Sequence, residues 1–130
     1  MAHSAHNNLE SIIMQSGKLI LGERILADPV EVASGFFERL RGLLGRSDMP
    51  SGSAMVIERC GSVHTVGMRF PLDLIFLDKE WRVVSVKRGV SSGCPMVSGG
   101  IRARRVVESR SGALDLNGIT PGDQFVFTAK

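Results

Sequence analysis

Short apolar runs, of the length typical of β-strands, recur through most of the chain. Short stretches rich in glycine, proline and aspartate separate these runs, as turns separate strands. Residues 9–15 fit either a first strand or a frayed turn. Gly22 interrupts the next run, where we expect a strand that is broken or kinked. The pattern predicts strands at residues 18–26, 54–58, 72–78, 82–87 and 102–109, and a turn that leads into the last strand at residues 121–128.

One predicted strand, LDLIFLD, is apolar on both of its alternating faces. Leu72, Leu74 and Phe76 fall on one face, and Ile75 and Leu77 fall on the other. A strand of this kind is covered on both sides, as in a sandwich or a barrel. The long stretch RGVSSGCPMVSGGI that follows the next strand is predicted to be a surface loop.

One segment carries the signals of a helix instead. Asp28 can cap it, Pro29 suits the first helical position, and Glu31 lies three residues after the cap. Gly45 is a natural stop. These signals predict a helix from Pro29 to Leu44. Its apolar stripe would consist of Phe36, Phe37, Leu40, Leu43 and Leu44.

Together these elements predict a mainly β (α+β) fold. We expect a small, mainly antiparallel β-sandwich or open barrel with one covering α-helix. No repeat and no internal boundary appears in the pattern, so residues 17–130 are predicted to form a single domain. Residues 1–16 are predicted to be a flexible N-terminal tail.

Composition narrows the function classes only slightly. The chain has 130 residues and a formal net charge of +3. A charge this small permits contact with nucleic acid or an anionic membrane but indicates neither. No apolar run approaches the roughly 20 residues of a membrane span. The first residues lack the regions of a secretory signal, so we expect a cytoplasmic protein without a membrane partner.

Arg102 to Arg105 form the densest basic stretch of the sequence. On a strand, Arg102 and Arg104 would share one face and Arg105 would take the other. The stretch contains no aromatic residue, whereas proteins that bind nucleic acid usually stack bases on aromatic rings. We therefore expect a solvated edge strand that is protected by its charge, and no nucleic-acid partner.

The segment CGSVHTVGMRFPLD holds the residues with the widest range of chemistry. Cys60 and His64 would suit a nucleophile and its general base, or two metal ligands. In a regular strand they share a face but lie about 13 Å apart. Only a sharp bend at Gly61 and Ser62 would bring them together. We therefore favour a buried thiol and a hydrogen-bonded imidazole over a catalytic pair.

Cys94, in the long loop, is the other cysteine. Together with Cys60 and His64 it would make a three-ligand set that zinc tolerates, but the residues come from separate segments and no CxxC pair is present. We expect no metal and no cofactor. We also expect no Cys60–Cys94 disulfide, because cytosolic thiols are usually reduced.

Asp73 begins an apolar strand, where a carboxylate must be paired or hydrogen-bonded. Its candidate partners are Arg69, Arg39 and nearby backbone N–H groups. One interpretation is a polar cluster that binds an anionic or polar ligand. The other, which we favour for Asp73, is that the carboxylate fastens the turn at Pro71 to neighbouring backbone.

Three blocks of the sequence resemble the DUF192 family, a set of small domains of unknown function. They are RLRGLLGR, CGSVHTVGMRFPLDLIFLD and RVVESRSGALDLNGITPGDQFVF, in the family's order, and they cover roughly Val32 to Phe127. The central block resembles the branch with a Cys-x-Ser-x-His-Thr motif. Another branch has tryptophan at the position of His64. The resemblance implies a compact, mainly β domain with a packed helix, and it implies no established biochemical role.

The sequence thus favours a monomeric, non-catalytic domain that binds a small molecule or a peptide. An alternative is a hydrolase or transferase that uses Cys60 as nucleophile and His64 as base, and a further alternative is a metal-binding module. Thiol reactivity and metal content separate these alternatives. The predicted ligand-binding residues are Arg39, Cys60, His64, Thr65, Arg69, Asp73 and Cys94.

Overall fold

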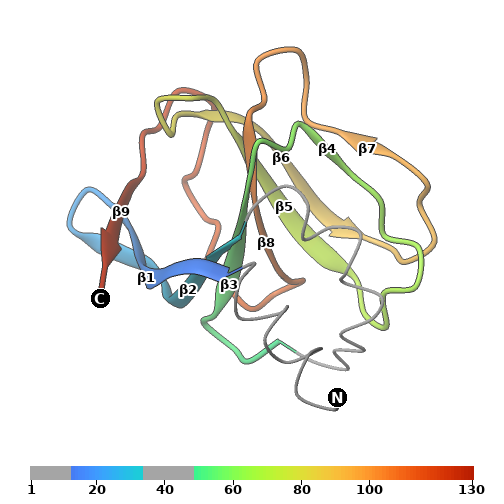
Figure 1. Ribbon diagram of the computed structural model, residues 1–130, viewed down its shortest axis with the longest axis horizontal. Helices are drawn as coiled ribbons and strands as arrows, with labels where there is room; N and C mark the ends of the chain where they lie inside the picture. Colours follow the sequence, from blue (N-terminus) through green and yellow to red (C-terminus); the bar gives the residue numbers. More distant parts are fainter. Residues whose placement is uncertain (1–12, 34–48) are drawn as a thin grey trace, which may run out of the picture.

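The computed structural model describes residues 13–33 and 49–130. Strands account for all the regular structure in these residues (Figure 1). They are β1 (Ile13–Leu21), β2 (Arg24–Ala33), β3 (Ala54–Glu58), β4 (Ser62–Val63), β5 (Leu72–Leu77), β6 (Val83–Val90), β7 (Val97–Ser98), β8 (Arg105–Arg110) and β9 (Val126–Ala129).

Most of the strands form one sheet in the order β6-β5-β8-β3-β2-β1-β9. Neighbours are antiparallel except for β2 and β3, which run parallel. The sheet is open, although a bridge between Arg82 and Gln124 brings the segment before β9 beside the start of β6. The other two strands, β4 and β7, form a separate antiparallel pair. Within the described residues, no helix is long and apolar enough to cross a membrane.

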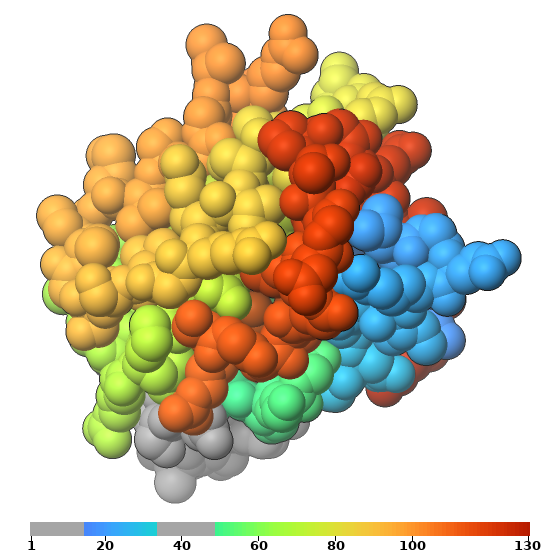
Figure 2. Space-filling view, turned by 180° about the vertical axis from the view of Figure 1, so that it is seen from behind, coloured from blue at the N-terminus to red at the C-terminus, as the bar shows by residue number. Residues whose placement is uncertain are grey.

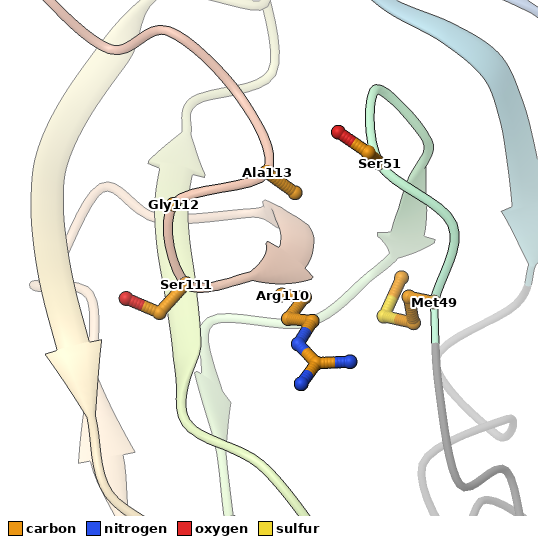
Figure 3. Close-up of a pocket in the computed structure, with 6 residues that line it drawn as sticks. All are labelled: Met49, Ser51, Arg110, Ser111, Gly112 and Ala113. Carbon is orange, nitrogen blue, oxygen red and sulfur yellow. The ribbon is translucent and has the colours of Figure 1, made fainter.

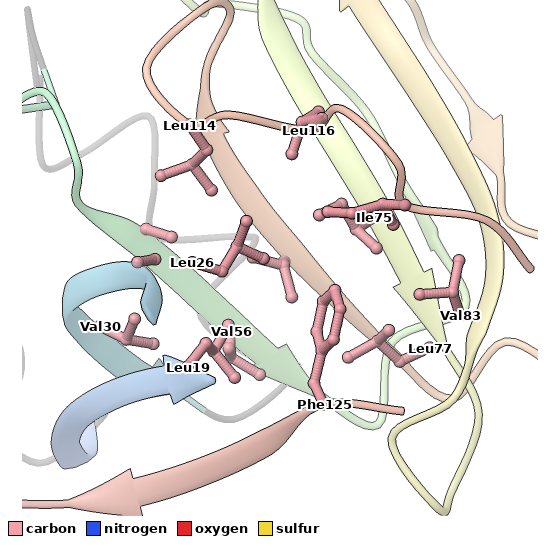
Figure 4. Packing of buried hydrophobic residues seen from close by; sticks show 14 of the residues in the cluster. Leu19, Leu26, Val30, Val56, Ile75, Leu77, Val83, Leu114, Leu116 and Phe125 are labelled. Carbon is pink, nitrogen blue, oxygen red and sulfur yellow. The ribbon is translucent and has the colours of Figure 1, made fainter. Parts of the chain in front are cut away.

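The large sheet is buried on both faces at β5, as the pattern of LDLIFLD predicts. Every residue of β5 is buried. Leu72, Leu74 and Phe76 join one apolar cluster, which also packs against the small sheet. Ile75 and Leu77 join the cluster on the opposite face (Figure 4). Two-sided burial of this strand and a mainly β fold are therefore confirmed.

The small sheet covers one face of the large sheet. Val63 of β4 and Val97 of β7 pack on the cluster that contains Phe76. Gly99, just after β7, lies against the Phe76 ring so closely that a Cβ would collide with it. This contact holds the segment that follows β7 close to the large sheet and fixes the surface that lies above β5.

The helix predicted from Pro29 to Leu44 is wrong at its start. Residues 29–33 continue strand β2. Residues 34–48 lie outside the described part of the chain, and with them the rest of the predicted helix and Arg39. A covering helix is therefore not shown.

The reason for this error is a β-bulge. The register of β1 against β2 shifts between Gly17 and Leu19, opposite Asp28 and Pro29. Proline is tolerated at a bulge because its missing N–H breaks no ladder hydrogen bond. Asp28 pairs with Lys130 (3.0 Å) instead of capping a helix.

The beginning and the RARR stretch also differ from expectation. Gly22 lies in a tight turn between β1 and β2, because Leu21 pairs with Arg24, so the run is a hairpin and not one kinked strand. Strand β1 begins at Ile13, earlier than the domain start expected from the sequence; residues 1–12 lie outside the described part.

RARR is no edge strand, since β8 begins at Arg105 and lies between β5 and β3.

Candidate functional site

The chain from Cys60 to Thr65 runs extended against residues 94–104. At one end the Cys60 N–H donates to the Arg104 carbonyl (2.9 Å), and at the other the Thr65 N–H donates to the Cys94 carbonyl (2.8 Å). Strands β4 and β7 pair between these two points. We call this pairing the central ladder, with an Arg104 end and a Thr65 end. It positions most of the residues that the sequence singled out.

At the Thr65 end, one side chain organises the loop. Thr65 is fully buried. Its hydroxyl donates to the Ser91 carbonyl (2.8 Å) and accepts the Cys94 N–H (2.9 Å). Its own carbonyl accepts the N–H groups of Gly93 (3.0 Å) and Met68 (3.1 Å). Thr65 therefore holds the loop in place, and its polar atoms are engaged within the protein.

The extended ladder separates the three residues with nucleophilic or metal-binding side chains. Cys60 precedes β4 in the chain and His64 follows it. An extended chain between them corresponds to a separation of about 13 Å. Cys94 lies at the far end from Cys60. The Cys60 thiol donates to the Ser62 carbonyl (3.0 Å), and neither Cys60 nor Cys94 is part of a disulfide among the described residues. Among the described residues, no group of three or more His, Cys, Asp and Glu side chains could hold a metal ion.

Asp73 is buried and bonded to backbone. One carboxylate oxygen accepts the Gly89 N–H (2.8 Å) of β6, and the other accepts the Gly112 N–H (3.0 Å) after β8. A carboxylate that accepts hydrogen bonds from two neighbouring segments fastens them to β5. This geometry agrees with the structural interpretation of Asp73. By contrast Arg69 is exposed, and His64 is partly exposed.

At the Arg104 end of the ladder lies a hollow of about 430 Å³. It is walled by the end of β3, the chain that enters β4, the turn after β5 and the start of β8. Its volume is in the range of sites for small molecules. Cys60, a predicted candidate, lies on its wall. Its charged side chains are Glu58, Arg59, Lys79, Arg104 and Arg105.

Arg105 has a structural role in this wall. Its guanidinium pairs with both oxygens of Glu58 (2.6 and 3.1 Å). It also donates to the carbonyls of Asp78 (2.9 Å) and Lys79 (3.1 Å), and it lies 4.4 Å over the Trp81 ring. These contacts join β3, β8 and the turn between β5 and β6. Its charge is neutralised by Glu58.

Three other cations of the hollow have no carboxylate partner. Arg59 and Lys79 are exposed and, in the described part of the chain, their side chains form no ion pair and no hydrogen bond. Arg104 donates to the carbonyls of Ile101 (2.9 Å) and Ala103 (3.0 Å). Those bonds orient its guanidinium without neutralising it.

The backbone of Arg59 is strained. Its φ of 54° lies in the left-handed region, which costs a non-glycine residue about 1 kcal/mol. Strain of this kind is concentrated at ligand sites, where surrounding structure holds a side chain in a required position. At this position the strain coincides with the hollow, which makes Arg59 a candidate for ligand contact.

A second hollow, of about 360 Å³, adjoins the first and shares Lys79 and Arg104 with it. It adds Arg102, which is exposed, and Arg82, which lies 3.9 Å from Glu80. Figure 2 shows the segment before β8 (orange) and the turn before β6 (yellow) projecting from the same end of the molecule. The two hollows therefore lie on one surface.

This surface carries the charge excess of the chain. Its basic side chains are Arg59, Lys79, Arg82, Arg102, Arg104 and Arg105, and its acidic ones are Glu58, Asp78 and Glu80. Six cations against three anions give +3, which equals the formal net charge of the whole chain. The other charges of the sequence balance. The two hollows thus have a local excess of positive charge.

Two further hollows are less charged. One of about 300 Å³ lies between Met49 and Ser51 on one side and the chain from Arg110 to Ala113 on the other (Figure 3). It has a single cation, Arg110, whose guanidinium lies 5.1 Å over the Phe70 ring. The other, of about 320 Å³, contains one arginine and two aspartates, among them Asp73.

The sequence did not single out Arg59, Lys79 or Arg104 as site residues. RARR was noticed, but its arginines were assigned to one solvated strand. In the structure the arginines of this stretch have two roles. Arg105 pairs with Glu58 inside the sheet, whereas Arg104 lines the hollow. Arg59 and Lys79 come from distant segments, and only the fold brings them beside Arg104.

Residues 20–127 match the model of DUF192, described as an uncharacterized ACR. The chain belongs to the DUF192 family. The resemblance found in the sequence is thereby confirmed for the family, while the branch with the Cys-x-Ser-x-His-Thr motif stays a prediction. A search of curated proteins finds no match to the chain.

Two solved structures share the fold of this DUF192 member. A protein of unknown function from Novosphingobium aromaticivorans DSM 12444 matches with a TM-score of 0.69 and 19% identity, covering 85% of this chain and 83% of its own. A proposed transcription regulator from Sinorhizobium meliloti 1021 matches with a TM-score of 0.68 and 20% identity, covering 89% of this chain and 95% of its own. At these identities the likeness concerns the fold.

Proposed function

We propose that this protein is a non-catalytic domain that binds a small molecule through an anionic group, phosphate or carboxylate, in the hollow at the Arg104 end of the central ladder. The observation that carries the proposal is the set of cations without carboxylate partners, Arg59, Lys79 and Arg104, around one concave site. Guanidinium groups bind such oxygens bidentately, and a charge-assisted hydrogen bond is about twice as strong as a neutral one.

A catalytic role is less well supported by this geometry. Cys60 lies on the wall of the hollow. His64, the candidate base, follows the opposite end of β4. General-base catalysis requires the two groups within hydrogen-bond reach. We therefore place Cys60 in the binding wall and give it no nucleophilic role.

A nucleic-acid partner is also less well supported. One of the related structures belongs to a proposed transcription regulator, and the surface is basic. Single-stranded nucleic acids are usually held by aromatic rings with an open face. Trp81, the aromatic residue next to the hollows, has Arg105 over its ring and stacks on Phe127 with 6.1 Å between centroids. Both neighbours compete with a base for this ring.

Thermal unfolding at rising concentrations of inorganic phosphate tests the proposal, with sodium chloride added to keep the ionic strength constant. A ligand that binds the folded state must raise the unfolding temperature. For the unsubstituted protein we expect a rise that grows with the logarithm of the phosphate concentration once that concentration exceeds the dissociation constant. The affinity derived from it should fall at least about tenfold in Arg104→Gln, because charge-assisted contacts are lost. Acetate in place of phosphate distinguishes carboxylate from phosphate recognition.

The matched control for Lys79→Gln is Lys87→Gln, which removes the same charge from an exposed lysine of β6. We expect loss of affinity in the first and no change in the second. Arg69→Gln tests whether phosphate binds instead near Arg69, where the sequence predicts ligand-binding residues. A loss in Arg69→Gln that exceeds the loss in Arg104→Gln, or no phosphate effect beyond that of sodium chloride, contradicts the proposal.

A further inference from the structure

We infer that the natural ligand carries two phosphate groups and that the two adjoining hollows bind one group each. This inference rests on the proposed function and specifies its ligand class. The hollows share Lys79 and Arg104, so a ligand bound in one lies beside the cations of the other. Each hollow also has an unshared arginine: Arg59 in the first and Arg102 in the second.

The number of uncompensated cations matches such a ligand. Arg105 is neutralised by Glu58, and Arg82 lies next to Glu80. Among the cations that line the two hollows, those without a carboxylate partner are then Arg59, Lys79, Arg102 and Arg104. A phosphate monoester carries about −1.5 to −2 near neutral pH. With the Asp78 carboxylate counted, the net charge of this surface is +3. Two such groups balance that charge, whereas one group leaves about +1 or more uncompensated.

The backbone of the turn that carries Lys79 is held by several hydrogen bonds. In the turn that carries Lys79, the Asp78 carboxylate accepts the N–H groups of Glu80 and Arg82 (both 2.9 Å). The Asp78 N–H donates to the Arg82 carbonyl (2.9 Å). Arg105 holds the same turn through its carbonyls. A preformed backbone in this turn lowers the entropic cost of binding.

The Trp81 backbone supports this view of the turn. Its φ of 66° is in the left-handed region, which a bulky residue seldom adopts. The Arg105 guanidinium over the ring and the Phe127 ring stacked on it hold Trp81 there. These contacts with Trp81 help to hold the turn between β5 and β6, and with it the backbone of Lys79 between the two hollows.

The test compares inorganic phosphate, pyrophosphate and a hexanediol bisphosphate on the full chain, by the same thermal titration at constant ionic strength. Once one group is bound, the second binds at a high effective concentration. We expect at least one bisphosphate probe to bind about tenfold or more tightly than inorganic phosphate. Arg102→Gln should abolish that gain while leaving the affinity for inorganic phosphate within about twofold. Lys87→Gln should keep the gain.

The outcomes separate the two proposals. If inorganic phosphate binds but neither bisphosphate binds more tightly, the proposed function stands and the two-group ligand is wrong. A gain that persists in Arg102→Gln also contradicts the two-group ligand, because the second hollow is then not used. If none of the three probes binds, the proposed function fails and this inference fails with it.

Discussion

The two ends of the central ladder differ in what their polar groups do. At the Thr65 end, the hydroxyl, N–H and carbonyl of Thr65 all bond to the protein. At the Arg104 end, Arg59 and Lys79 have no bonded side-chain partner in the described part of the chain, and Arg104 bonds only to carbonyls. The polar groups at the Thr65 end hold a loop in place, whereas the cations at the Arg104 end are exposed to solvent.

This difference shows which residues of the segment from Cys60 to Asp73 stabilise the fold and which are available to a ligand. Cys60 to Asp73 looks like one functional motif in sequence, yet Thr65 and Asp73 are buried and bonded to backbone. Buried polar groups with complete hydrogen bonds stabilise a fold, and removing one partner leaves the other unsatisfied. Cations without carboxylate partners around a hollow lend themselves to ligand binding instead. The comparison therefore predicts large stability effects at one end and small ones at the other.

The largest effect on stability is expected from Thr65→Val. The substitution keeps the shape of the side chain but removes its bonds to the Ser91 carbonyl and the Cys94 N–H. We expect a loss of about 1–3 kcal/mol in the free energy of unfolding, measured by urea denaturation. The exposed Thr128→Val of β9 is the control, with a change within about 0.5 kcal/mol. An equal, small effect in both variants would mean that Thr65 does not hold the loop.

A much smaller effect on stability is expected from Arg59→Asn. Asparagine adopts the left-handed conformation more readily than arginine, so the substitution relieves backbone strain at φ 54°. The free energy of unfolding should stay within about 0.5 kcal/mol or rise slightly, while phosphate affinity falls. Destabilisation by more than about 1 kcal/mol in urea would show that the Arg59 side chain supports the fold.

Much of the sheet was predictable because a strand that is buried on both faces is a continuous run of apolar residues. The apolar residues on both faces of β5 predict a strand buried on both sides, and the apolar runs of β3 and β6 predict strands at these positions. The start of the helix was mispredicted because its signals are local. Asp28, Pro29 and Glu31 suit a helix start, but pairing with β1 and β3 makes them part of a strand. Tertiary pairing overrides local propensity in such a case.

The site was harder to predict than the fold. Cys60 was identified and lies on the wall of the hollow. The cations around it come from the end of β3, the turn before β6 and the chain before β8, and no spacing in the sequence connects these places. The same limit applies to RARR, since only the position of β8 inside the sheet distinguishes the paired Arg105 from the exposed Arg104.

The most direct test of the difference between the two ends is a map of backbone amide chemical shifts during titration with inorganic phosphate at constant ionic strength. The proposal predicts saturable shifts concentrated at residues 59–61, 78–82 and 101–105, around the two hollows. It predicts little change at residues 64–69 and 91–96, around the Thr65 end. Shifts concentrated at the Thr65 end, or spread evenly over the surface, would contradict it.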